Sequence, residues 1–198
     1  MNICVFASGA GSNFKNILEA RKNGIINSDV ILLITNNSKC GAVEIADSYG
    51  VEVFHISRKV FTDLSDDDYA DLFLQKLKQK KIDLIVLAGY MKMLDLKVIR
   101  EYENKIINIH PALLPAFGGK GMYGINVHKA VIEAKEKKSG VTIHIVNERY
   151  DEGKILFQKS VEVLDSDDEF SLQKKVLILE HKYYPLVIKD IEQNKIIL

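Results

Sequence analysis

The sequence contains little cysteine, no surplus of charge of either sign and no long apolar run. Its two cysteines, Cys4 and Cys40, have no CxxC partner, which favours reduced, packed thiols over a disulfide or a zinc site, and we expect no metal. Basic and acidic residues number 27 each, so no positive surplus is available to contact a nucleic-acid backbone. No apolar run approaches the roughly 20 residues that span a bilayer, and no basic region with a cleavage site precedes the first apolar segment. These absences predict a cytoplasmic protein without a nucleic-acid or membrane partner.

Short apolar runs alternate along the chain with stretches of helical spacing. Near-continuous apolar runs are typical of parallel strands buried on both faces. A length of 198 residues, with 47% apolar and 27% charged residues, suits one domain over 1–198. The pattern predicts a single-domain α/β fold, a mostly parallel twisted sheet with helices on both faces. Strands are expected at residues 2–7, 30–35, 51–55, 82–88, 105–110, 141–146 and 155–163, and helices after residue 13 and at 42–48, 66–81, 126–135 and 169–193, the last interrupted before Pro185.

The turn after the first strand, residues 8–13, reads Ser-Gly-Ala-Gly-Ser-Asn. Its glycines let the backbone approach a ligand, and the amides that begin the following helix favour an anion such as a phosphate. The dinucleotide-binding fingerprint needs a third glycine where Phe14 stands, so NAD fits poorly. An ordinary strand–helix turn in which Ser12 or Asn13 caps the helix explains the same residues equally well.

Asn108 and His110 lie near the end of the fifth predicted strand, just before Pro111. Alternate residues of a strand point to the same face, so the two polar side chains should project together. Pro111 ends the strand because it cannot donate to the sheet ladder, which places His110 at the carboxyl edge, where open α/β sheets bind ligands. The other interpretation is a buried pair that satisfies its own hydrogen bonds.

Two more segments follow predicted strands. Met91, Met93 and Leu94 come after the fourth strand, where they either wall a pocket for a flat ring system or belong to the core beneath the next helix. Residues 116–124 contain four glycines, which predicts a mobile loop near the site.

Four segments then fall into one order along the chain: Ser8-Gly9-Ala10-Gly11-Ser12-Asn13, Leu87-Ala88-Gly89-Tyr90-Met91, Asn108-Ile109-His110-Pro111 with Leu113-Leu114-Pro115, and Tyr150-Asp151-Glu152-Gly153. In these segments the sequence resembles the phosphoribosylglycinamide formyltransferases, folate-dependent enzymes of purine biosynthesis, over essentially its whole length. The resemblance implies a Rossmann-like formyltransferase fold. It also implies that the formyl group of the co-substrate 10-formyltetrahydrofolate moves to the amine of glycinamide ribonucleotide.

The resemblance implies roles for particular residues. The catalytic group would be Asn108, His110 and Asp151; the ribonucleotide would contact Gly11, Ser12, Asn13 and Glu180; and the folate would contact Met91, Lys92, Met93, Leu94 and Asn108. Two positions depart from the family pattern and bear on folate contacts: Ala112 replaces the usual serine, and Lys92 stands where arginine is frequent.

These residue types suit formyl transfer. Attack of an amine on a formyl carbon produces a tetrahedral intermediate with a negative oxygen, which needs hydrogen-bond donors, and a positive nitrogen, which must lose a proton. Asn108 and a protonated His110 would be the donors. Asp151 would favour the imidazolium and accept the amine's proton, directly or through water.

Asp151 belongs to the turn-rich segment 147–153, which by itself is a hairpin loop between two strands. On the strand before it, Thr142 and His144 share a face. We expect this strand to run parallel to its neighbour, so that the loop reaches the edge where His110 ends.

Three other functions fit parts of the pattern. A formyltetrahydrofolate hydrolase would use a similar Asn-His-Asp group but would have no ribonucleotide phosphate to hold. A methionyl-tRNA formyltransferase would need an added tRNA-binding domain, for which 198 neutral residues leave no room. A nucleotide-binding module without activity would keep the phosphate loop alone. Both a monomer and a homodimer are compatible with the sequence.

Overall fold

The computed structural model describes residues 1–198 and contains seven strands and six helices. The strands form one sheet in the order β3-β2-β1-β4-β5-β6-β7. The predicted α/β class with a mostly parallel sheet is confirmed. The residues fall into two compact units, Met1–Ile107 and Asn108–Leu198. None of the six helices combines the length and the apolar character that a transmembrane span requires.

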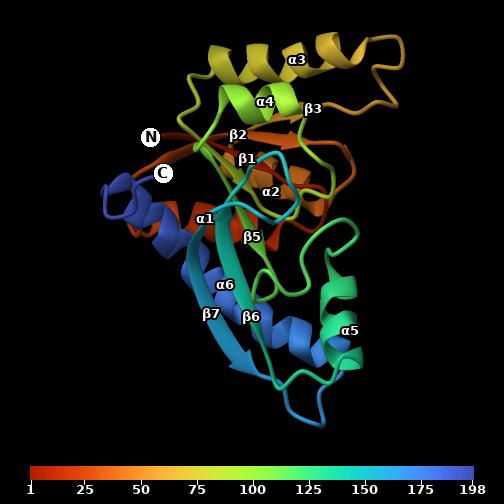
Figure 1. The fold of residues 1–198 in the computed structure, drawn as a ribbon. Helices are drawn as coiled ribbons and strands as arrows, with labels where there is room; N and C mark the ends of the chain where they lie inside the picture. The colour runs from red at the N-terminus through yellow and green to blue at the C-terminus, as the bar shows by residue number, and fades with distance from the viewer. The chain divides into compact units, whose positions relative to one another are not determined.

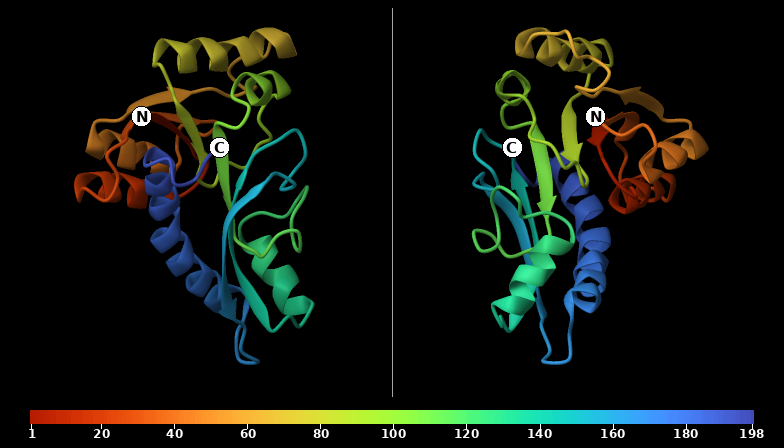
Figure 2. Two further views of the ribbon diagram at one scale, coloured as in Figure 1. Left: turned by 60° about the vertical axis from the view of Figure 1, so that its left-hand side comes forward. Right: turned by 90° about the vertical axis from the view of Figure 1, so that its right-hand side faces the viewer.

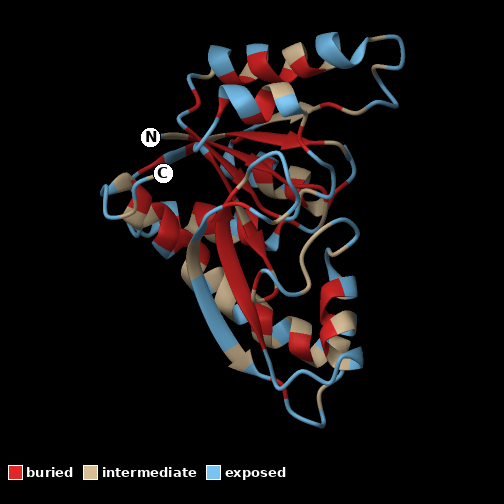
Figure 3. Ribbon diagram, viewed as in Figure 1, coloured by how far each residue is buried: buried red, intermediate tan, exposed pale blue.

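The first unit alternates strands and helices. β1 runs parallel to β2 and to β4, and β2 runs parallel to β3. Figures 1 and 2 show α1 and α2 on one face of these strands and α3 and α4 on the other. β1 and β4 are therefore buried on both faces, which explains their uninterrupted apolar sequences (Figure 3). The elements are β1 (Asn2–Phe6), α1 (Ser12–Lys22), β2 (Asp29–Thr35), α2 (Gly41–Tyr49), β3 (Glu52–His55), α3 (Asp66–Gln79), β4 (Leu84–Leu87) and α4 (Leu96–Glu101).

The second unit is built on a hairpin and two helices. β6 and β7 pair antiparallel, and α6 packs against both strands and against α5. Buried side chains join α5 to α6, and β7 is an edge strand that is largely exposed (Figure 3). The elements are β5 (Ile106–His110), whose first two residues belong to the first unit, α5 (Ile125–Glu133), β6 (Lys138–Ile145), β7 (Ile155–Glu162) and α6 (Glu169–Glu192).

Two elements extend or correct the sequence predictions. α6 is a single helix that continues through Pro185, so the predicted interruption is wrong. Pro185 is buried together with Tyr184 and Val187, and we attribute the continuity of the helix to this packing, which offsets the hydrogen bond that proline cannot donate. α4 is the helix expected after Leu94, for which no bounds were predicted; the side chain of Asp95 caps it by accepting a hydrogen bond from the amide of Lys97 at 2.8 Å.

The turn between β1 and α1 is held tightly against α2. Gly11 precedes α1 with φ 77° and no side chain caps this helix end, so the alternative with Ser12 or Asn13 as the cap is wrong. A Cβ atom on Gly11 would lie 2.8 Å from Cα of Ala42 and 2.9 Å from its Cβ. Only glycine fits both the left-handed backbone and this close approach.

Replacing Gly11 should therefore lower the free energy of unfolding by more than the left-handed backbone conformation alone explains. We expect Gly11→Ala to lower the free energy of unfolding by about 1–2 kcal/mol for the left-handed conformation and by a further ~1–3 kcal/mol for overpacking against Ala42. Gly24→Ala is the matched control, because Gly24 has φ 70° and nothing within 4 Å of its would-be Cβ. Urea unfolding of both variants measures the difference; equal losses would contradict the collision with α2.

Candidate active site

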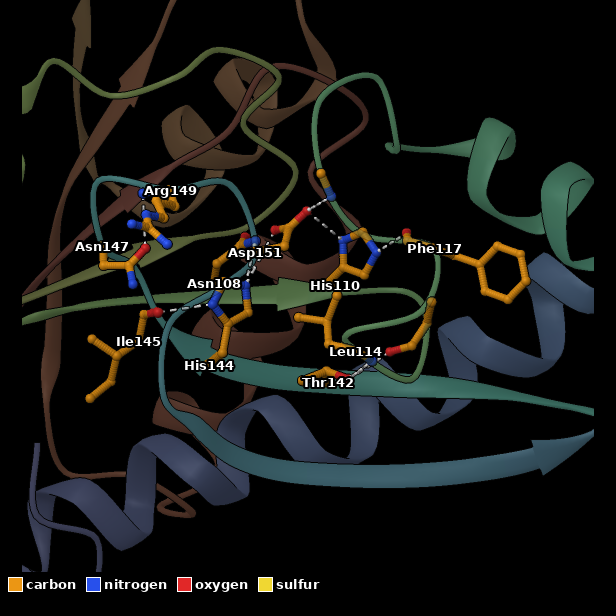
Figure 4. A network of polar contacts seen from close by, with 12 residues as sticks. Asn108, His110, Leu114, Phe117, Thr142, His144, Ile145, Asn147, Arg149 and Asp151 are labelled. Carbon is orange, nitrogen blue, oxygen red and sulfur yellow. Dashed lines mark hydrogen bonds and ion pairs between the residues drawn. The ribbon is translucent and has the colours of Figure 1, made fainter.

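Asn108 and His110 project toward one group of polar side chains, as the alternation along β5 predicts (Figure 4). Asn108 is half-buried, and His110 is only 3% exposed. The amide nitrogen Nδ2 of Asn108 lies 3.2 Å from Nε2 of His144, and Nδ1 of His110 lies 3.6 Å from Oδ2 of Asp151. The structure thus brings Asn108, His110 and Asp151 together, with His144 as a fourth member.

Asp151 reaches this group by a different route from the one expected. Asn108 contacts His144, whereas Ala112 and Leu114, which follow later in the chain, contact the earlier residue Thr142. β6 therefore runs opposite to β5, and the prediction of a parallel strand is wrong. The loop after β6 instead folds back on its own strand, because Gly153 packs against the carbonyl of Ile145 and Asp151 itself takes φ 56°.

The carboxylate of Asp151 lies beside one backbone amide and two histidine rings. Oδ2 accepts a hydrogen bond from the amide of Gly119 at 2.9 Å, and Oδ1 lies 3.5 Å from Nε2 of His144. Burial alone raises the pKa of Asp151, but the contact with His144, the proximity of the His110 ring and the Gly119 amide together outweigh burial, so the pKa falls below its usual value. Asp151 is therefore an anion at neutral pH.

The proton of His110 is placed by a backbone carbonyl. Nε2 lies 2.8 Å from the carbonyl oxygen of Phe117, which can only accept, so Nε2 must be the donor. Burial lowers the pKa of His110 more strongly than the charge of Asp151 and the Phe117 carbonyl raise it, and His144 lowers it further. Asp151 thus favours the imidazolium, as expected, but burial outweighs this effect and the net pKa of His110 is lowered. The neutral imidazole, with its proton on Nε2, has its lone pair at Nδ1 on the side of Asp151.

His144 was not predicted as a site residue. It is 2% exposed; its Nδ1 donates to the carbonyl of Ile145 at 2.9 Å, and its Nε2 lies 3.2 Å from Nδ2 of Asn108. The shared face of Thr142 and His144 was visible in the sequence. Nothing in the sequence indicated that this face meets Asn108, because the contact joins residues 36 positions apart.

The glycine-rich loop contributes backbone groups to the site. The Phe117 carbonyl and the Gly119 amide contact His110 and Asp151, respectively, and Figure 4 shows the loop passing over both side chains. Gly118, the residue between Phe117 and Gly119, leaves no room for a side chain. A Cβ there would lie 2.6 Å from Cδ2 of Leu114 and 3.2 Å from Cβ of Asp151. The predicted proximity of this loop to the site is confirmed, and its mobility stays a prediction.

The two predicted binding segments of the first unit meet at Ser8. The Ser8 hydroxyl donates to Oδ1 of Asn36 at 2.6 Å and accepts from the amide of Met91 at 3.1 Å. The turn that leads into Gly11, Ser12 and Asn13 is thereby tied to the segment that follows β4. Ser12 is exposed, whereas the side chain of Asn13 is buried.

The four residues of the segment after β4 differ in burial. Met91 and Met93 are 50% and 44% exposed, and Lys92 is also exposed, so these side chains are available to a ligand. Leu94 is 5% exposed and belongs to the core, as the alternative interpretation held. Glu180, the remaining predicted contact, is half-buried on α6 in the second unit. No cluster of three or more His, Cys, Asp or Glu side chains is arranged to hold a metal ion.

Comparison with known proteins places this site in context. A family model described as "Formyl transferase" matches residues 1–188. The chain is 34% identical to the phosphoribosylglycinamide formyltransferase of Bacillus subtilis, covering 94% of this chain and 92% of that protein. A crystal structure of the phosphoribosylglycinamide formyltransferase from Bacillus halodurans superimposes with a TM-score of 0.89 at 36% identity, covering 96% of this chain and 95% of that one.

Longer relatives match as well. The chain is 45% identical to the chloroplastic phosphoribosylglycinamide formyltransferase of Arabidopsis thaliana, covering 98% of this chain but 66% of that protein, and 44% identical to the protein of Vigna unguiculata, covering 98% and 62%. It thus spans no more than about two thirds of these plant relatives. A formyltetrahydrofolate deformylase from Pseudomonas syringae shares the fold with a TM-score of 0.86 at 20% identity, covering 100% of this chain and 63% of that one.

The charge of Asp151 should be measurable through the titration of His110. Asp151 raises the pKa of His110 and burial lowers it, so Asp151→Asn removes the opposing effect and should move the His110 pKa further down. Histidine ring NMR over a pH series measures the shift. Glu152→Gln is the control, because Glu152 is exposed and pairs with Arg149; an unchanged His110 pKa in Asp151→Asn would show that the carboxylate does not act on this imidazole.

Proposed function

The chain belongs to the phosphoribosylglycinamide formyltransferase family, and we propose that it transfers the formyl group of 10-formyltetrahydrofolate to the amine of glycinamide ribonucleotide. The products are formylglycinamide ribonucleotide and tetrahydrofolate, as a step of de novo purine biosynthesis. The observation that carries the proposal is the meeting of Asn108, His110 and an ionised Asp151 at the end of β5. These are the residue types that formyl transfer to an amine requires.

Asn108 is the residue that we assign to the formyl oxygen. Its amide nitrogen carries two hydrogens, of which the contact with Nε2 of His144 uses one. The other is available to donate to the oxygen that becomes negative in the tetrahedral intermediate. His144 keeps the amide in this orientation, because its own Nδ1–H is held by the carbonyl of Ile145.

His110 and Asp151 handle the proton. The amine nitrogen bonds to the formyl carbon, the bond from that carbon to the folate nitrogen breaks, and one proton passes overall from the amine to the folate nitrogen. Nδ1 of neutral His110 can take this proton because Nε2–H is committed to Phe117. The imidazolium that forms is stabilised by the Asp151 carboxylate 3.6 Å away, and it is then a donor, the role that the sequence suggested for it.

The binding roles rest on the family resemblance and on local structure. We place the ribonucleotide phosphate on the backbone of Gly11, Ser12 and Asn13, supported by a helix start that no side chain caps. The exposed Met91, Lys92 and Met93, the backbone at Leu94 and the side chain of Asn108 are assigned to the folate, and Glu180 to the ribonucleotide. We further propose that residues 1–198 act as one formyltransferase domain without a metal, as a monomer or homodimer in the cytoplasm.

The test of this function is an assay with and without the acceptor. Loss of 10-formyltetrahydrofolate should depend on glycinamide ribonucleotide; loss without it would identify a hydrolase, and no loss in either case would indicate a binding module. Asp151→Asn keeps the side-chain shape and should lower kcat on the order of 100- to 10,000-fold with little change in either KM.

Glu152→Gln is the matched control for this variant as well, since it removes a neighbouring carboxylate from the same loop and should leave kcat near that of the natural protein. Thermal unfolding of both variants separates chemistry from folding. Loss of stability in Asp151→Asn with kcat per folded molecule retained would assign Asp151 to the hairpin rather than to the reaction.

Phosphate binding at the start of α1 can be tested by adding a negative charge, which stabilises the helix but repels the proposed ligand. An acidic residue at a helix N-terminus stabilises the helix by about 0.3–1 kcal/mol, yet it repels a bound phosphate. The free energy of unfolding of Ser12→Asp should therefore be no lower than that of the natural protein. Its KM for the ribonucleotide should rise at least tenfold (about 1.4 kcal/mol), with the folate KM unchanged. Ser12→Asn has the same shape without the charge; if it matched Ser12→Asp, or if both KM values rose together, the phosphate would lie elsewhere.

A further inference from the structure

A buried threonine binds the segment that follows His110. The hydroxyl of Thr142 donates to the carbonyl of Ala112 at 2.6 Å and accepts from the amide of Leu114 at 3.0 Å. It also accepts from Nε2 of Gln158 at 2.9 Å, and the same nitrogen lies 2.8 Å from the carbonyl of Leu114. Thr142 has no exposed surface. One donor and two acceptor positions are all that a hydroxyl offers, so its hydrogen-bonding capacity is fully used.

This network lies between two members of the candidate active site along the chain. His110 ends β5, residues 112–114 are held by Thr142 and Gln158, and Phe117 follows after a turn in which the amide of Ala116 donates to the carbonyl of Leu113 at 3.1 Å. The carbonyl of Phe117 then returns to Nε2 of His110. The connection between His110 and Phe117, which are seven positions apart, is thus anchored at its middle (Figure 4).

We propose that Thr142 is a positioning residue for His110: its hydroxyl fixes the 112–114 segment so that the Phe117 carbonyl holds the proton on Nε2 and leaves Nδ1 toward Asp151. Thr142 does not touch the reacting atoms in this assignment. Only its effect on turnover rests on the proposed function; its effect on the imidazole does not.

The burial of the network explains why one hydroxyl can matter. Removing it leaves the Ala112 carbonyl and the Leu114 amide without this partner in an interior position, where an unsatisfied polar group is costly. The segment is then expected to shift toward other partners, and the Phe117 carbonyl shifts with it. A displacement of about 1 Å at a catalytic group can lower a rate by roughly 100-fold.

His110 is a sensitive reporter because few groups face it. They are the Asp151 carboxylate from the β6–β7 loop, His144 from β6, His128 from α5 and the Phe117 carbonyl from the glycine-rich loop. Thr142 carries no charge, so its replacement changes none of the three ionisable neighbours. A change in the titration of His110 would therefore come through the Phe117 carbonyl, which raises the His110 pKa.

The decisive comparison is between Thr142→Val, which has the same shape without the hydroxyl, and Thr142→Ser, which keeps it. We expect Thr142→Val to lower the pKa of His110 in histidine ring NMR and to lower kcat on the order of 10- to 100-fold with both KM values little changed. Thr142→Ser should restore both properties. If the natural protein transferred no formyl group, the NMR titration would still decide whether Thr142 positions His110.

A matched control removes the contribution of stability. Ile143→Val shortens a buried side chain on the same strand, one residue away on the opposite face, and should lower the melting temperature without moving the His110 pKa. Thr142→Val that behaved like Ile143→Val in titration and kcat would overturn the proposal. If Thr142→Val did not fold, Gln158→Met, which removes the donor from the exposed edge strand, should still lower the His110 pKa, and an unchanged value would reject the positioning role.

Discussion

The contacts of the half-buried Asp151 carboxylate are the interactions on which the candidate active site depends. The carboxylate receives the Gly119 amide and faces both His110 and His144, so one charge gathers groups from β5, β6 and the glycine-rich loop. Removing a charge from water is costly, and here the Gly119 amide and the neighbouring histidine rings offset that cost. Because the site is held by mutual contacts within one compact unit, its geometry exists before any ligand arrives.

Part of this arrangement follows from the sequence. The period of two along β5 places Asn108 and His110 on one face, and Pro111 ends the strand beside them, because both effects are local properties of the backbone. The direction of β6 could not be read in this way. The direction of β6 depends on the strand with which β6 pairs, and that pairing is not a local property of the backbone. The folding back of the 147–153 loop relies on the left-handed backbone of Asp151, which is unusual for a residue other than glycine.

Electrostatics set a second limit on prediction from sequence. The presence of Asp151 beside His110 correctly indicates which way the carboxylate moves the imidazole pKa, but the net direction is decided by burial, which the sequence does not specify. His128 shows the same effect more strongly: burial lowers its pKa to about 4, with a further contribution from His110. The interior of this unit thus favours neutral imidazoles, and a proton taken up there is readily given back.

The tight packing of the turn after β1 bears on the entropy of the phosphate binding proposed for it. Gly11 lies against Ala42, the Ala42 amide donates to the Gly9 carbonyl at 3.3 Å, and a side chain on Gly41 would collide with the carbonyl of Ala10. Such a loop has few conformations left to lose, whereas a flexible loop would surrender about 1–2 kcal/mol for each residue ordered on binding. The phosphate proposed to bind here would meet a preformed loop, so its capture would be limited by diffusion and desolvation rather than by ordering of the polypeptide around it.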